Sequence, residues 1–165
     1  MGLDITAASR MEFVCALEGD EDDWPDGLRF VYANPDFPDH IDGRTEGLYR
    51  ITGMDFNFRA GSYHGYNYWR SQLSELALGA PADDVYADPS RFVGKCAYEL
   101  INFSDCEGSI GPETCAKLRD DLDGLRRSLQ PKHLELVNAG YSDGLLDTWI
   151  DAFRLGADGG FVMFH

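Results

Sequence analysis

The stretch ELINFSDCEGSIGPETCAKLRDDLDGLRRSLQP, residues 99–131, decides the fold class, because it joins an apolar run to the clearest helical pattern in the chain. Pro112 suits the first position of a helix, and Pro131 ends the pattern. Between them, apolar residues recur three and four positions apart, the spacing of one helix face: Cys115, Leu118, Leu122, Leu125 and Leu129. The sequence therefore predicts a helix over 112–129.

The run before this helix, KCAYELINF at 95–103, has the apolar density of a buried strand, and we expect it to be a central one. Residues 104–111 would then form a strand-to-helix loop. Shorter runs rich in β-branched and aromatic residues predict further strands at 3–6, 12–17, 28–32, 47–52, 55–60 and 161–164.

Two more helices are predicted on either side of this region. The first lies within 62–79, where Ser62 can cap the start and Gly79 the end. The other follows Asp143, a candidate N-cap, and covers 144–157. Residues 80–91 read as a polar loop, and a short turn or helix is expected around 132–140. Strands first and helices second predict a single α+β domain over 1–165, with a mainly antiparallel sheet and about three helices packed on one face.

The charge of the chain is strongly acidic. It has 29 Asp and Glu against 14 Lys and Arg, for a formal net charge of −15. Such a surface repels phosphate backbones and anionic lipid, so we expect no direct nucleic-acid binding and no membrane binding. It would attract a basic protein partner, although solubility alone also explains it.

The cysteines indicate whether the chain belongs to a reducing or an oxidising compartment. Cys15, Cys96, Cys106 and Cys115 form no CxxC pair. The chain shows no basic-then-apolar leader and no apolar run of roughly 18 residues. We therefore expect reduced thiols and a cytoplasmic location.

The first group of candidate site residues stands side by side in the loop 104–111: Ser104, Asp105, Cys106 and Glu107. Loops at strand ends are where rigid scaffolds display reactive groups, and Gly108 and Gly111 let a ligand approach the backbone. Asp105 and Glu107 are candidate general bases. Cys106 is a candidate nucleophile, although the neighbouring carboxylates would keep its thiol protonated. Alternatively, these side chains only hydrogen-bond the turn.

The second group lies in FRAGSYHGYNYWR, residues 58–70, a predicted strand-to-helix junction with glycines on both sides of Ser62. Ser62, Tyr63, Asn67 and Arg70 are the ligand-binding candidates there, with Arg70 suited to an anionic group. Tyr66 and Trp69 fit the core face of the helix instead. His165 follows the last predicted strand, and we place it at the rim of the same pocket.

Known metal and cofactor motifs do not appear. The sequence holds no HExxH, P-loop, GxGxxG or GxSxG pattern. We therefore assign no metal site and no cofactor.

Four blocks resemble a family of small uncharacterised proteins of bacteria and their phages: GLDIT, FRAGSYHGYNYWR, ELINFSDCEGSIGPETCAKL and ADGGFVMFH. The resemblance covers about residues 1–5 and 48–165. His64 stands where that family would have a small residue such as Ser. The resemblance implies that the glycine-bearing junctions are the family's signature, and it implies no particular activity.

Three functional hypotheses follow from these residues. In the first, which we favour, the 61–70 and 104–111 turns form a pocket that binds, or also hydrolyses, a small polar ligand. In the second, the acidic chain is an interaction module, such as a phage-encoded inhibitor or a DNA mimic, that docks on a basic partner. In the third, the SDCEG loop at 104–108 only caps a helix.

Overall fold

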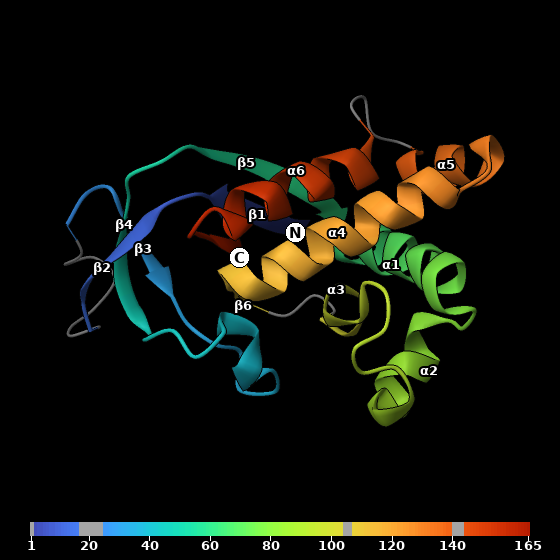
Figure 1. Cartoon of the computed structure of the whole chain (residues 1–165), viewed down its shortest axis with the longest axis horizontal. Helices are drawn as coiled ribbons and strands as arrows, with labels where there is room; N and C mark the ends of the chain where they lie inside the picture. Colours follow the sequence, from blue (N-terminus) through green and yellow to red (C-terminus); the bar gives the residue numbers. More distant parts are fainter. Residues whose placement is uncertain (1, 17–24, 104–106, 140–143) are drawn as a thin grey trace.

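The computed structural model describes residues 2–16, 25–103, 107–139 and 144–165 (Figure 1). The strands of these residues are β1 (Gly2–Ala8), β2 (Met11–Cys15), β3 (Leu28–Val31), β4 (Gly47–Ile51), β5 (Asp55–Ser62), β6 (Gly108–Ile110) and β7 (Phe161–Phe164). The α-helices are α1 (Tyr63–Leu78), α2 (Ala82–Ala87), α3 (Tyr98–Asn102), α4 (Pro112–Ser128), α5 (Pro131–Asn138) and α6 (Leu145–Ala157), with 3-10 turns at Pro38–Ile41 and Pro89–Arg91.

The described strands divide between two sheets. One has four strands in the order β5-β1-β7-β6, and the other has three in the order β2-β4-β3. Every pairing in both sheets is antiparallel. The predicted α+β class and antiparallel sheet are thus confirmed.

Helices α1, α4 and α6 pack on one face of the four-stranded sheet, as predicted (Figure 1). Because side chains of a strand alternate between faces, β1 directs Leu3, Ile5 and Ala7 to this side. Trp149 of α6 is fully buried among aromatic rings from α1, β5, α6 and β7: Phe58, Tyr66, Trp69, Phe153 and Phe164. This aromatic cluster is the centre of the main core.

The opposite face of the same sheet carries a second, smaller core. Ala8 of β1 and Phe161 and Met163 of β7 are buried there against the three-stranded sheet. Val31 and Tyr49 are among the side chains of that sheet that are buried in this core. The ring of Tyr49 meets that of Phe161 edge-on at 5.1 Å. Strands β1 and β7 therefore lie between two cores.

The prediction of a strand at 95–103 was wrong. Residues Tyr98–Asn102 form helix α3, after a turn in which Ala97 has a φ of 54°. Side chains of α4 hold this turn: the Asp121 carboxylate accepts the N–H of Ala97 at 2.9 Å, and Lys117 donates to the carbonyl of Lys95 at 3.0 Å. These partners lie 24 and 22 residues further along the chain. A short apolar run does not by itself distinguish a buried strand from a buried helical turn.

Two related predictions also change. Residues 80–91 are not a simple loop, because α2 forms there and buries Ala82 and Val85, three positions apart. The described part of 104–111 is not a plain loop after a strand, because it follows α3 and contains β6.

Three predicted helix ends are confirmed. Ser62 caps α1 by accepting the N–H of Gly65 at 3.0 Å, and Gly79 ends that helix with a φ of 68°. Pro112 is the first residue of α4. Asp143, the predicted cap of α6, lies outside the described residues.

The start of α4 is capped by a residue from a distant segment. The Asp42 carboxylate accepts the N–H groups of Glu113 at 2.7 Å and Thr114 at 3.0 Å, as well as the Thr114 hydroxyl at 2.6 Å. Gly111 permits this approach, since a Cβ there would lie 2.6 Å from the Asp42 carboxylate. The contact ties the 38–42 turn to the longest helix of the main core.

Replacing Asp42 by glycine is expected to lower the free energy of unfolding by about 1 kcal/mol, because two N–H groups at the start of α4 lose their acceptor. Glycine fits the φ of 55° at this position, so backbone strain does not contribute. Urea unfolding followed by circular dichroism measures the loss. Asp39→Ala, at an exposed carboxylate of the same turn, is the control. Equal losses in the two variants would contradict the capping role.

Candidate functional site

Most of the candidate residues in the first predicted junction, residues 58–70, make contacts that stabilise the fold. Ser62 caps α1, and Tyr63 is 36% exposed. Arg70 is only 6% exposed and donates to the carbonyl of Ile101 at 2.6 Å and to the Asn67 side chain at 3.1 Å. Its guanidinium therefore holds the C-terminal end of α3, where a positive charge also suits the helix dipole.

The second predicted loop is only partly described. Ser104, Asp105 and Cys106 lie outside the described residues. The carbonyl of Phe103, just before them, accepts the Tyr66 hydroxyl at 3.2 Å, so α1 lies directly against the chain that leads into this loop. Cys15, Cys96 and Cys115 are free thiols, and burial raises the pKa of Cys115 well above its usual value.

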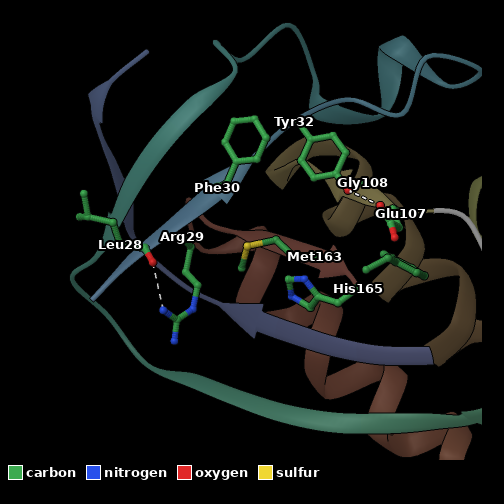
Figure 2. A pocket seen from close by; sticks show the side chains of 9 residues that line it. Leu28, Arg29, Phe30, Tyr32, Glu107, Gly108, Met163 and His165 are labelled. Carbon is green, nitrogen blue, oxygen red and sulfur yellow. Dashed lines mark hydrogen bonds between the residues drawn. The ribbon is translucent and has the colours of Figure 1, made fainter. Parts of the chain in front are cut away.

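Glu107 and His165 come together in a cleft of about 630 Å³ between β3 and the β6–β7 edge (Figure 2). Side chains of β7 form a buried floor, and β3 forms the facing wall. The lining residues are Leu28, Arg29, Phe30, Tyr32, Glu107, Gly108, Met163, Phe164 and His165. No residue of the 61–70 junction lines this cleft, which lies between β3 and the edge formed by β6 and β7.

One end of the cleft is closed by contacts between the two sheets. The N–H of Ser109 on β6 donates to the carbonyl of Tyr32 at 2.9 Å. The Tyr32 hydroxyl donates to the Glu107 carboxylate at 3.3 Å, and the Asn34 amide donates to the Glu107 carbonyl at 2.8 Å. Gly108 is required at this point, because its φ is 134° and a Cβ would lie 3.0 Å from the backbone nitrogen of Asn34.

These contacts also change the chemistry of Tyr32. Burial, followed by the negative charge of Glu107 and the hydrogen bond to it, raises the pKa of Tyr32 to about 12. The phenol therefore stays protonated at neutral pH and remains a hydrogen-bond donor.

The imidazole of His165 is held by a chain of hydrogen bonds across three strands. The Thr6 hydroxyl donates to Asn57 at 2.7 Å, so its oxygen is left to accept from Nε2–H of His165 at 3.1 Å. The backbones of His165 and Asp4 are also paired, with the N–H of His165 donating to Asp4 at 2.9 Å. The orientation of His165 in the cleft is thus set by β1 and β5.

Arg29 supplies the positive charge of the cleft. It is half-buried on β3, and its guanidinium donates to the carbonyl of Leu28 at 3.0 Å. The cleft thus combines a guanidinium, an imidazole, a carboxylate and a phenol around the buried apolar side chain of Met163. Such a set can accept and donate hydrogen bonds to a polar molecule and compensate charges of either sign.

Sequence reasoning found only part of this cleft. It selected Glu107 and His165, but it treated LRFVY at 28–32 simply as a strand and so missed Arg29 and Tyr32. The available signal was the arginine inside an otherwise apolar strand, which indicates that one side of that strand faces polar surroundings.

Two searches of the described residues give negative results. No group of three or more His, Cys, Asp or Glu side chains within them is arranged to hold a metal ion. None of the helices formed by these residues has the length and apolar character needed to cross a membrane.

No protein-family model, no curated protein and no solved structure matches this chain. The resemblance of its four blocks to a family of small bacterial and phage proteins therefore rests on the residues alone.

Replacing Arg70 by lysine is expected to lower the free energy of unfolding by about 1–3 kcal/mol, because a single ammonium group cannot bridge Ile101 and Asn67 in the same geometry. Arg50→Lys, at an exposed position of β4, is the matched control. Chemical denaturation of the two variants measures the difference. A fully stable Arg70→Lys variant would restore Arg70 as a candidate for ligand binding.

Proposed function

We propose that this chain binds a small polar molecule in the cleft between β3 and β7. The observation that carries the proposal is the combination of Arg29, Tyr32, Glu107 and His165 around one cavity of about 630 Å³. This volume falls within the roughly 300–1,000 Å³ that is usual for small-molecule sites.

The origin of these four side chains supports the proposal. Arg29 lies on β3 and Tyr32 follows it, Glu107 directly precedes β6, and His165 directly follows β7, so both sheets contribute. Tyr32 and His165 are held in place by hydrogen bonds to Glu107 and Thr6. Polar groups that the fold orients in advance lose less conformational entropy when a ligand binds.

A hydrolytic version of this function would require a general base in the cleft. Glu107 would serve as that base, since its carboxylate is exposed and accepts the Tyr32 hydroxyl. Binding is the function that we propose, and hydrolysis would be an addition to it.

A thermal-shift screen with nucleosides, sugars, amino acids and short peptides at millimolar concentration tests the proposal. At least one class is expected to raise the Tm of the wild-type protein, because a ligand that binds only the folded state stabilises it. Arg29→Gln together with Glu107→Gln should abolish the shift, whereas Arg50→Gln on β4 should retain it. Absence of any shift, or a shift that survives the double substitution, would falsify binding in this cleft.

The net charge of −15 favours a second candidate function, docking on a basic protein. Its support is the exposure of two acidic groups. One lies in the described part of the N-terminal loops (Asp26, Asp36 and Asp39), and the other on and after α2 (Asp83, Asp84 and Asp88). These carboxylates are available to a cationic surface without any change in the core.

Binding of a fluorescent oligolysine probe distinguishes this second function from the first. If the acidic surface is a docking site, replacing one of the two groups by asparagines should weaken binding more than replacing the other. Binding should also fall steeply at roughly 0.5 M salt, where surface charges are screened. Equal effects of the two triple substitutions would mean that only the net charge matters, which argues against a docking site.

A further inference from the structure

We infer that the ligand of the cleft is a short, peptide-like zwitterion whose carboxylate pairs with Arg29 and whose ammonium group pairs with Glu107. This inference rests on the proposed function, because it names the chemical class of molecule that the same cleft would bind.

Arg29 provides the anion-binding end. It is half-buried and lines the cleft, and its guanidinium donates to the neighbouring carbonyl of Leu28 at 3.0 Å. In the parts of the chain that the structure describes, Arg29 forms no ion pair, although the chain has 29 acidic residues. A guanidinium carries five N–H donors, so most of its hydrogen-bonding capacity remains for a carboxylate.

Glu107 provides the cation-binding end. Its carboxylate is exposed and accepts the Tyr32 hydroxyl at 3.3 Å. No lysine or arginine within the described ranges forms an ion pair with it. A carboxylate offers about four acceptor positions, so it can also receive an ammonium group of the ligand.

The spacing of the two ends sets the length of the ligand. Arg29 and Tyr32, the partner of Glu107, are three residues apart on one extended segment, so their Cα atoms are about 10 Å apart, and we take this backbone spacing as the scale of the gap between the two ends. Figure 2 shows Arg29 to the left and Glu107 to the right, with Met163 and His165 between them. A peptide of about three extended residues spans this distance between its charged termini.

The middle of the cleft suits the body of such a peptide. Met163 supplies a buried thioether, and the rings of Phe30 and Tyr32 stack on each other at 5.0 Å. Strand β3 is the outer strand of its sheet, and the backbone of Tyr32 points away from β4 toward Ser109. Because the N–H and carbonyl of Tyr32 are bonded to Ser109, the cleft would contact the body of a peptide through the side chains of Phe30, Tyr32 and Met163.

The charges also argue against other ligand classes. A nucleotide would bring two or more negative charges to a protein of net charge −15 and would meet Glu107 at one end of the cleft. A neutral sugar would leave the charges of Arg29 and Glu107 uncompensated. A zwitterion compensates both and adds no net charge.

The experiment uses tripeptides with alanine at both ends and a central Leu, Phe, Ser or Gln, each as the free zwitterion, the N-acetylated form and the C-terminal amide. Isothermal titration of the full chain measures the dissociation constants. At least one zwitterion is expected to bind, and each blocking group should weaken its binding about tenfold or more, because one charge-assisted contact is lost.

Two single variants assign the ends. Arg29→Gln should remove the preference for the free carboxylate over the amide and keep the preference for the free amine. Glu107→Gln should do the reverse, and Arg50→Gln should change neither. This crossed pattern is one that a general loss of stability would not produce.

Three outcomes would overturn the inference. They are blocked peptides that bind as tightly as the zwitterion, variants that lose both preferences together, and absence of binding by all four zwitterions. If nucleosides or sugars still shift the Tm through Arg29 and Glu107, the cleft binds another class and the proposed function stands. If no compound of either experiment binds, the proposed function fails as well.

Discussion

The structure depends on the antiparallel pairing of β1 with β7, the two central strands of the larger sheet. Because side chains alternate along a strand, each of these strands must bury one set of side chains in the main core and the other set in the smaller core. Ile5 and Val162 are buried beneath the helices, whereas Ala8 and Met163 are buried against the smaller sheet. A shift of one residue in this register would exchange the two sets and disrupt both cores together.

The same pairing explains the face on which this cleft lies. The helices cover their face of the larger sheet with a continuous apolar cluster. On the other face the smaller sheet buries Phe161 and Met163, and Thr6 and His165 form a polar chain with Asn57 of β5. The contact between Ser109 and Tyr32 joins β3 to β6 at one end of the cleft. The polar side chains of the cleft therefore lie at the edge of the smaller apolar core.

The site was predictable only in part, and particular residues show why. Glu107 and His165 stand beside glycines or at the end of a strand, positions where local sequence indicates a surface. Arg29 has no such signal, because its role depends on which sheet edge faces β3. Arg70 shows the opposite case: its charge suggested a ligand, whereas in the fold it is 6% exposed and donates to the carbonyl of Ile101. Burial of a charged residue depends on neighbours distant in sequence.

The sequence by itself determined the α+β class, the antiparallel strands, the long helix after Pro112 and the caps at Ser62 and Gly79, because each rests on short-range periodicity or backbone preference. Only the tertiary structure decided that 98–102 is a helix, since Lys117 and Asp121 hold the turn before it. Only the tertiary structure also placed Arg29 and Tyr32 opposite His165. Those residues are far apart along the chain, and the packing of one sheet on another brings them to the same cleft.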